Sequence, residues 1–347
     1  MRYDNVYLLN TGVCLPPRVP LTRAVAELGA PPELLRSGLG SVCVEPSRSS
    51  AELAAEAARE ACAGHQVDRL RAVLHSYLWF KGADLWTAAQ YIGHCVGADR
   101  CPGYDLTQLC NGGMAALELA AGMVQASGGS VLVTTGDRFA EPAFDRWGRG
   151  QDGAAGSRAP FSVAGDGGTA VLVGASHGPV RLLAATTAVD NSLEGEARGR
   201  GFADGPGATT PDFGRRYAEY FEDEETVARH FERMATAMGR GISTVLAEAG
   251  TKLAEVDWFV PPVMTRQEVK GLLASLRADV SASTWDFGAG TGHLGAGDQA
   301  AGLDHLLRSG AAKPGQRVLL MGSAIGFACT FALVEVIAPR TAAGGSA

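Results

Sequence analysis

Cys110 is the residue whose type and neighbours most directly suggest chemistry. It follows an extended segment at 104–109 and precedes Asn111, Gly112 and Gly113, which open an apolar helical stretch. Small residues after a sulfur permit a sharp turn into a helix, and a helix N-terminus offers positive potential and free N–H groups that favour a thiolate and can hold an oxyanion. Free cysteines are also among the most buried residue types, so the pattern alone leaves both a nucleophile and a structural thiol open.

A second group of chemically useful side chains lies between Gly292 and Asp298. His293 has the type needed to take a proton from a thiol placed beside it, and Asp298 follows at a distance that lets it fix the imidazole tautomer and stabilise the charged ring. The residue types therefore allow a triad of Cys110, His293 and Asp298. For Asp298, an N-cap of the helix predicted at 299–307 is the alternative.

Two other interpretations of this region are weaker. The string GAGTGH at 288–293 superficially resembles a dinucleotide-binding loop, but it lacks the third-glycine spacing after a clean strand. A metal site from His293, Asp298 and His305 is allowed by residue type, although the helix would have to turn two of them toward one point. We therefore predict no metal ion and no permanently bound cofactor.

Other polar residues have simpler interpretations. His75 and His94 lie in apolar-rich runs and are predicted to be core or rim histidines. Asp166, in the string GDGG, is predicted to serve a turn between strands. The segments 142–158 and 194–214, rich in Gly, Arg, Asp and Pro, are predicted to be surface loops at the entrance of a pocket.

The apolar pattern indicates an α/β protein with largely buried strands, because strand-like and helical segments alternate. Strand-like runs rich in Val, Leu and Ile lie at 6–10, 72–76, 131–135, 169–174, 180–185, 258–260, 318–321 and 330–336. Apolar residues near i, i+3 and i+4 predict helices at 51–62, 85–95, 112–125 and 223–249.

The second half of the chain repeats the first in outline. The order DLTQLCNGGMAALELA, VLVTTGD and GDGGTAVLVG is echoed by WDFGAGTGHLGAGDQAAGLDHLL, VLLMGS and GFACTFALVEV. This self-similarity predicts two copies of one αβ unit. We place the N-terminal half, which carries Cys110, at 1–176, and the C-terminal half, which carries the His293 and Asp298 loop, at 177–347.

The composition predicts a folded, cytoplasmic protein. With 46% hydrophobic and 19% charged residues, the chain can bury a sizeable core. A net charge of −7 argues against a nucleic-acid partner, and no run approaches the length of a membrane span or a signal peptide. The cysteines number seven and form no CxxC pair, which is typical of reduced thiols.

Several stretches resemble, in order and spacing, the β-ketoacyl-ACP synthase III family of the thiolase superfamily. They are YDLTQLCNGGMAALELA, FSVAGDGGTAVLV, DWFVPP, the loop at 292–298 and GSAIGFACTFALVEV, so that the resemblance covers about residues 3–337. It implies an α/β thiolase fold in which two related halves form a five-layered αβαβα core, usually as a homodimer. It also implies that Cys110 is the nucleophile and that oxyanion donors are the N–H of Cys110 and one in the loop with Ser323 and Ala324.

Two positions depart from the family pattern. Condensing members carry a His after a proline in the segment that reads FVPP here, and an Asn after the glycine that matches Gly292, whereas this chain has Pro262 and His293. Pro262 cannot donate a hydrogen bond, so the pair of side chains that supports malonyl decarboxylation is absent. The chain resembles instead synthase III-like acyltransferases of natural-product pathways, polyketide pathways among them, which share this Gly-His…Asp departure and form no carbon–carbon bond.

We therefore predict a ping-pong acyltransferase. The resemblance implies a phosphopantetheine-linked donor, from acyl carrier protein or CoA, and the acceptor is a hydroxyl or amine of a small molecule or the thiol of a second carrier protein. Arg266 and Lys270 could meet the donor's phosphate or an acidic carrier helix, or form only a solvated helix face. A starter-unit condensing synthase and a non-catalytic partner subunit are the alternatives, and the retained Cys, His and Asp argue against the second.

Overall fold

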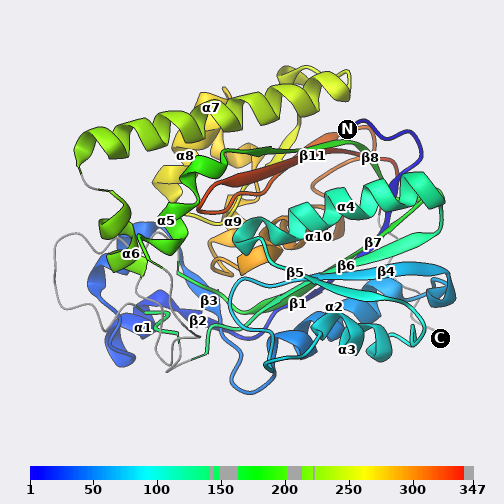
Figure 1. The fold of residues 1–347 in the computed structure, drawn as a ribbon, viewed down its shortest axis with the longest axis horizontal. Helices are drawn as coiled ribbons and strands as arrows, with labels where there is room; N and C mark the ends of the chain where they lie inside the picture. Colours follow the sequence, from blue (N-terminus) through cyan, green and yellow to red (C-terminus); the bar gives the residue numbers. More distant parts are fainter. Residues whose placement is uncertain (141–143, 148–162, 202–212, 222, 340–347) are drawn as a thin grey trace.

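The structure is a computed structural model that describes residues 1–140, 144–147, 163–201, 213–221 and 223–339 (Figure 1). Most of the loop predicted at 142–158 lies outside the described residues. Within the loop predicted at 194–214, the chain instead forms a short helix, α5 (Gly195–Arg198), and the side chain of Glu196 is buried.

One sheet of nine strands dominates the described part of the chain, with the order β5-β4-β6-β7-β1-β8-β11-β10-β9. Its strands are β1 (Tyr7–Cys14), β4 (Leu70–Ser76), β5 (Gly103–Leu106), β6 (Ser130–Asp137), β7 (Gly167–Gly174), β8 (Val180–Val189), β9 (Trp258–Val260), β10 (Arg317–Met321) and β11 (Ala328–Val336). A separate pair consists of β2 (Arg18–Pro20) and β3 (Ser41–Cys43). Every residue of β6 and β7 is buried, which explains their nearly continuous apolar sequences.

The strand order contains the same topology twice. In β4-β6-β7-β1 the first pair is parallel and the next two are antiparallel, and β9-β10-β11-β8 has the same sequence of orientations. The two sets join through β1 and β8, which pair only at Tyr7 with Arg181 and Leu8 with Val180. The division at 1–176 and 177–347 falls in the turn between β7 and β8 and stays a prediction.

Helices lie in three layers around the sheet (Figure 1). The helices α7 (Glu224–Glu248) and α8 (Arg266–Ser275) cover one outer face, and α2 (Ser50–Cys62) and α3 (Ala88–Cys95) cover the other. Between them lie α4 (Gly112–Ser127) and α10 (Asp298–Arg308), whose buried side chains share one core with strands of both sets. The outer layers have cores of their own. The remaining helices are α1 (Leu21–Glu27), α6 (Phe213–Tyr220) and α9 (Trp285–Gly288).

The predicted helix at 85–95 begins three residues later than expected, at Ala88. Leu85 has a φ of 49° and is fully exposed, so the chain is left-handed there and cannot continue a helix toward its N-terminus. The carboxylate of Asp105 accepts hydrogen bonds from the N–H groups of Ala88 and Ala89, at 3.1 and 2.9 Å. A side chain from β5 therefore fixes the start of α3.

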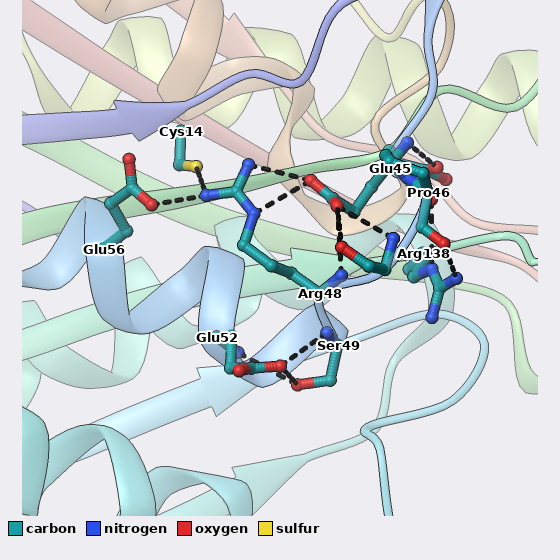
Figure 2. Close-up of polar contacts among 10 residues, drawn as sticks. Cys14, Glu45, Pro46, Arg48, Ser49, Glu52, Glu56 and Arg138 are labelled. Carbon is teal, nitrogen blue, oxygen red and sulfur yellow. Dashed lines mark hydrogen bonds and ion pairs between the residues drawn. The ribbon is translucent and has the colours of Figure 1, made fainter.

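Helix α2 starts at a capping box, and the spacing of a serine three residues before a glutamate is typical of one. Ser49 accepts a hydrogen bond from the N–H of Glu52, and the carboxylate of Glu52 accepts one from the N–H of Ser49 (Figure 2). The alanines of the helix face the sheet and are buried. Small side chains on this face let the helix lie close to β1, β6 and β7.

Candidate active site

Cys110 lies in a short 3-10 turn, η3 (Leu109–Asn111), that leads directly into α4. Leu109 has a φ of 49°, which is unusual for a non-glycine residue and sharpens the turn. A Cβ at Gly112 would lie 1.8 Å from the hydroxyl of Ser76, and one at Gly113 would lie 2.2 Å from the carbonyl oxygen of Ala296. These glycines are therefore needed because the turn packs tightly against β4 and against the loop that follows His293.

The structure brings Cys110, His293 and Asp298 together. Nε2 of His293 lies 3.1 Å from Sγ of Cys110, and Nδ1 of His293 lies 2.6 Å from Oδ2 of Asp298. Cys110 is 6% exposed and His293 5% exposed, so a reaction here would take place away from bulk water. This order of contacts is the one in which a carboxylate orients an imidazole and the imidazole exchanges a proton with sulfur.

Asp298 is not the N-cap that the alternative interpretation expected. The N-cap position of α10 is Gly297, and Asp298 is the first helical residue. Its carboxylate accepts hydrogen bonds from the N–H of Val263 at 2.7 Å and from the N–H of Leu294 at 2.8 Å, both outside the helix. These bonds fix the carboxylate in the direction of His293.

The charge state of His293 follows from its two neighbours. Burial alone would lower the pKa of His293, but the carboxylate of Asp298 and the sulfur of Cys110 outweigh it and hold that pKa well above its ordinary value. The imidazolium form is therefore favoured in the resting site. An imidazolium next to sulfur stabilises a thiolate, which is the reactive form of cysteine.

The backbone of His293 is held on both sides by the segment before β7. The N–H of His293 donates to the carbonyl oxygen of Val163 at 3.0 Å, and the N–H of Gly165 donates to the carbonyl oxygen of His293 at 2.8 Å. These two hydrogen bonds restrain the backbone of His293 and so limit how far its imidazole can move. The position of this segment consequently decides the position of the imidazole.

Asp166 stabilises that segment, which corrects its interpretation as a simple turn residue. Each oxygen of its buried carboxylate accepts a hydrogen bond from the guanidinium of Arg146 at 2.8 Å. The N–H groups of Glu45 and Phe139 donate further hydrogen bonds to the same carboxylate. Arg146 also donates to the carbonyl oxygens of Cys43, Ala164 and Phe139. This buried ion pair joins four chain segments behind the imidazole, and a paired, fully bonded charge is the form in which burial is tolerated.

Further charged contacts hold the segment that leads from β3 to the start of α2 (Figure 2). The guanidinium of Arg48 lies between the carboxylates of Glu45 and Glu56 and also contacts the sulfur of Cys14. Although burial opposes it, hydrogen bonds from Arg48 and from Ser47 lower the pKa of Glu45 to about 2. The segment between β3 and α2 is therefore held by charge at neutral pH.

Asp137 is a further buried carboxylate near the site, and it is not among the site residues predicted from the sequence. It accepts hydrogen bonds from the N–H groups of Leu78, Trp79 and Ala296, at 2.8, 3.0 and 3.3 Å. Burial raises the pKa of Asp137 to about 7, against these three donors and the nearby His293, which favour the charged form. The available signal was a carboxylate at the end of the apolar run VLVTTGD, where strand ends commonly carry polar groups into a site.

A cavity of about 400 Å³ opens onto Cys110 and His293. Among the described residues that line it, His293 is the one imidazole, and Pro262 is also part of the lining. The rest of the described wall is mostly apolar and sulfur-rich, and it consists of Met234, Met238, Val263, Met264, Glu268, Gly271, Leu272, Met321, Gly322, Ser323, Ala324, Ile325, Phe327 and Phe331. Such a cavity suits a small apolar group with few fixed polar contacts.

Comparison with known proteins decides the family. The family described as 3-Oxoacyl-[acyl-carrier-protein (ACP)] synthase III matches residues 104–191, and its C-terminal part matches residues 246–336. The solved structure of ChlB3, titled an acyltransferase, has a TM-score of 0.89 and 30% sequence identity, covering 97% of this chain and 99% of that chain. The chain belongs to the synthase III family of the thiolase superfamily.

Other proteins in the comparisons are less similar to this chain. A mycobacterial β-ketoacyl-[acyl-carrier-protein] synthase III of Mycobacterium marinum is 24% identical over 347 residues, 96% of each chain. Acetoacetyl CoA synthase NphT7 of a Streptomyces species is 29% identical over 262 residues, 71% of each chain. The 3-oxoacyl-[acyl-carrier-protein] synthase III of Aquifex aeolicus has a TM-score of 0.74 at 20% identity, covering 95% of this chain and 99% of that one. The predicted α/β thiolase fold is thereby confirmed.

The synthase III resemblance predicted oxyanion donors in the loop after β10, and the structure corrects one of them. The N–H of Ala324 donates to the carbonyl oxygen of Ala328 at 2.9 Å, so it is already used within the loop. Within the described chain, the N–H groups of Cys110 and Ser323 make no hydrogen bond. The role of these two as oxyanion donors stays a prediction.

Arg266 and Lys270 lie exposed on α8, beside the cavity rather than in its wall. From the same helix, Glu268, Gly271 and Leu272 line the cavity. Glu268 also forms a capping box with Thr265, so its carboxylate is occupied at the helix start. A contact of Arg266 or Lys270 with a carrier protein or CoA stays a prediction, as does assembly of the chain as a homodimer.

The weaker interpretations fit the structure poorly. Gly288 is the last residue of helix α9, and Gly290 and Gly292 follow that helix rather than a strand, so the strand-loop-helix context of a dinucleotide site is absent from this described segment. The ring of His305 stacks on Phe287 with centroids 4.5 Å apart, away from His293. Within the described ranges, no three His, Cys, Asp or Glu side chains are grouped to hold a metal ion, and no helix is long and apolar enough to cross a membrane.

The two histidines predicted to be core or rim residues differ in their surroundings. His75 is fully buried in β4, with Nδ1 3.0 Å from the hydroxyl of Thr134, and burial lowers its pKa to about 4. His94 is exposed at the end of α3 and pairs with Asp99 at 2.6 Å. Neither lines the cavity beside Cys110, in line with their interpretation as core and rim residues.

Proposed function

We propose that this synthase III family member is an acyltransferase that forms no carbon–carbon bond. It takes an acyl group from a thioester of acyl carrier protein or CoA onto Cys110 and passes it to a hydroxyl, an amine or a carrier thiol. The observation that carries the proposal is the pairing of His293 with Cys110 at 3.1 Å while Pro262 lines the same cavity. One imidazole serves the sulfur, and the neighbouring proline has no proton to donate.

In the first half-reaction, the thiolate of Cys110 attacks the thioester carbonyl carbon and a new C–S bond forms. The N–H groups of Cys110 and Ser323 are the donors proposed for the resulting oxyanion. The intermediate collapses as the bond to the pantetheine sulfur breaks. His293 gives its Nε2 proton to that departing thiolate, and Asp298 holds the opposite ring nitrogen throughout, which keeps Nε2 as the exchanging atom.

In the second half-reaction, His293 is neutral and acts as a base. Its Nε2 takes the proton from the acceptor's O–H, N–H or S–H as that atom attacks the acyl carbon on Cys110. The bond to Cys110 breaks, the sulfur leaves as a thiolate, and the imidazolium is restored beside it. The cycle returns the site to its starting charge without any further reagent.

A condensation would need more than this chemistry. Decarboxylation of a malonyl thioester builds negative charge on the thioester oxygen, and side-chain donors aimed at that oxygen are the usual support. Pro262 supplies none, and His293 is engaged with Cys110 and Asp298. The similarity to ChlB3, titled an acyltransferase, supports transfer, whereas the similarity to NphT7, named an acetoacetyl CoA synthase, favours the condensing alternative.

An assay with carboxyl-labelled malonyl thioester separates the two functions. The protein is first acylated, then given the malonyl thioester and, in a parallel reaction, a panel of alcohols, amines and carrier thiols. We expect no enzyme-dependent release of labelled carbon dioxide and a product with an unchanged acyl length. Steady release of label, with a ketoacyl product two carbons longer, would establish a starter-condensing synthase instead.

A further inference from the structure

Asn111 is the residue next to the nucleophile, and its side chain is completely buried. Its Nδ2 donates to Oε1 of Gln108 at 2.6 Å and to the hydroxyl of Thr330 at 2.9 Å. Its Oδ1 accepts from the N–H of Thr330 at 3.0 Å. A backbone N–H can only donate, so the amide atom bonded to the N–H of Thr330 must be the oxygen, and the NH2 group takes the other position. Both the nitrogen and the oxygen of the Asn111 amide therefore have hydrogen-bond partners.

Thr330, the residue that Asn111 binds, is hydrogen-bonded to the loop that carries Ser323, the second proposed oxyanion donor. The N–H of Gly322 donates to the carbonyl oxygen of Thr330 at 2.8 Å, and the N–H of Thr330 donates to the carbonyl oxygen of Gly322 at 3.2 Å. Ser323 follows Gly322 directly, and both line the cavity with Cys110. Asn111 thus connects Cys110 to Ser323 through a single residue of β11.

The fit at this point is close. A Cβ at Gly322 would lie 2.6 Å from Oδ1 of Asn111, so the amide occupies the space beside the loop and sets how near the loop can come. The hydroxyl of Thr330 also lies 2.7 Å from that of Thr187, which donates to the carboxylate of Glu118 further along α4. The helix of the nucleophile is therefore fastened to β11 and β8 at two points.

We propose that Asn111 is a positioning residue that sets the spacing between the N–H groups of Cys110 and Ser323, the two oxyanion donors. The inference rests on the proposed function, because these donors matter only if Cys110 accepts an acyl group. The two donors lie on segments joined by the contact between Asn111 and Thr330, residues 219 positions apart in sequence. Oxyanion donors act at about 2.7–3.1 Å, and a misplacement of about 1 Å costs on the order of 100-fold in rate.

Two reactions of the same sulfur test the proposal. Acylation of Cys110 by a thioester passes through an oxyanion, whereas alkylation by iodoacetamide displaces iodide directly and forms none. Both rates are followed by intact mass, with hexanoyl and benzoyl thioesters of N-acetylcysteamine as the acyl probes. For Asn111→Ala we expect acylation to slow by about 10- to 100-fold and alkylation to stay within about two-fold of wild type.

Variants of Thr330, the partner of Asn111, show whether a change in rate comes from this contact or from a loss of folding. Thr330→Val keeps the shape and removes the hydroxyl, so acylation should slow in the same direction, and Thr330→Ser, which keeps the hydroxyl, should lose less than Thr330→Val. Thr134→Val is the matched control: it removes a buried hydroxyl that bonds His75 on another strand, and acylation should be unchanged. If Asn111→Ala does not fold, the comparison of Thr330→Val with Thr330→Ser decides.

Each outcome bears on a different statement. Equal slowing of acylation and alkylation in Asn111→Ala, or no slowing of either, would overturn the positioning role. A wild-type protein that is alkylated at Cys110 but accepts no acyl group from any thioester would remove the proposed function instead, and this inference with it. Selective loss of acylation in Asn111→Ala and Thr330→Val would support the role of Asn111.

Discussion

Oδ2 of Asp298 lies 2.6 Å from Nδ1 of His293. Asp298 makes this contact as the first residue of helix α10 and not as its N-cap, which is Gly297. Its Oδ2 also accepts a hydrogen bond from the N–H of Val263 and its Oδ1 accepts one from the N–H of Leu294, so the backbone holds both oxygens of the carboxylate. The imidazole is then left with one free nitrogen, Nε2, and that atom points at sulfur. Chemistry at Cys110 is therefore expected to depend on a residue that does not touch it.

The first prediction concerns the nucleophile. Wild-type protein incubated with an acyl thioester should gain one acyl mass, and Cys110→Ala should gain none, because the proposed attack needs this sulfur. Cys101→Ser is the control, since Cys101 is a partly exposed thiol outside the site, and it should be acylated as wild type. Intact mass followed by peptide mapping makes the measurement, and label retained in Cys110→Ala would remove the claim.

The second prediction concerns the base. His293→Ala should slow transfer by about 10²–10⁴-fold, the usual cost of losing a general base. Asp298→Asn should also lose activity, because an amide cannot stabilise the imidazolium. Single-turnover rates give the size of each effect. Full turnover in Asp298→Asn with only a lower melting temperature would reduce Asp298 to a packing role.

The third prediction concerns the pH dependence of the acylation step. The pKa of His293 is held well above its ordinary value by Asp298 and Cys110, against burial. The imidazolium that serves the leaving thiol is lost as pH rises through that raised pKa, so wild-type acylation should decline only above neutral pH. Asp298→Asn removes the carboxylate's share of this increase and leaves that of Cys110, so the alkaline limb should move to lower pH. Pre-steady-state acylation measured from pH 5 to 10 tests the shift, and identical limbs would contradict it.

The fourth prediction concerns stability and His75. The pKa of His75 falls from 6.5 to about 4 on folding, so between these values the unfolded chain binds more protons than the folded one. The contribution of His75 to the free energy of unfolding should therefore be fully present above pH 6.5. It should be lost as pH drops toward 4, which lowers the free energy of unfolding by about 3 kcal/mol. Asp105 and Lys81 influence the same ring and remain in both proteins compared. Urea unfolding of wild type and His75→Phe at several pH values should give a shallower slope for the variant, and parallel slopes would exclude His75.

The fifth prediction compares two glycines with similar backbones. Gly295 has a φ of +61° and a Cβ there would lie 2.1 Å from Oδ2 of Asp137, whereas Gly250 has a φ of +63° and open space around it. Gly250→Ala should cost about 1–2 kcal/mol from backbone strain alone. Gly295→Ala should cost about 1–3 kcal/mol more and should also slow acylation, because it displaces the turn beside His293. Denaturant unfolding and acylation rates test this, and equal costs at the two sites would contradict the crowding argument.

Local signals explain why much of the fold could be predicted from the sequence. The strand predicted at 258–260 matches β9 to the residue, and the helix predicted at 223–249 matches α7 closely because Asp223 caps it. The Cys110 turn could also be anticipated, since its glycines are adjacent in sequence. The start of α3 could not, because it depends on Asp105 from another element.

Contacts between distant segments explain what the sequence could not reveal at the site. Asn111 and Asp137 are residue types that usually mark turns, and only the fold places Thr330 or Ala296 against them. The choice between Ser323 and Ala324 depends on a backbone bond from Ala324 to Ala328. No pattern of residue types in the loop distinguishes these two neighbours.

The middle layer of helices has a consequence for how the protein matures. Cys110 lies in the turn directly before α4 and Asp298 begins α10, and both helices pack in one core between the two sets of strands. During synthesis the sulfur is made long before the imidazole and the carboxylate that act on it. A nascent chain with only the first set of strands therefore lacks the imidazole and the carboxylate that the proposed chemistry at Cys110 requires. The proposed acyl transfer therefore requires both sets of strands to have folded together, because neither set carries all three residues.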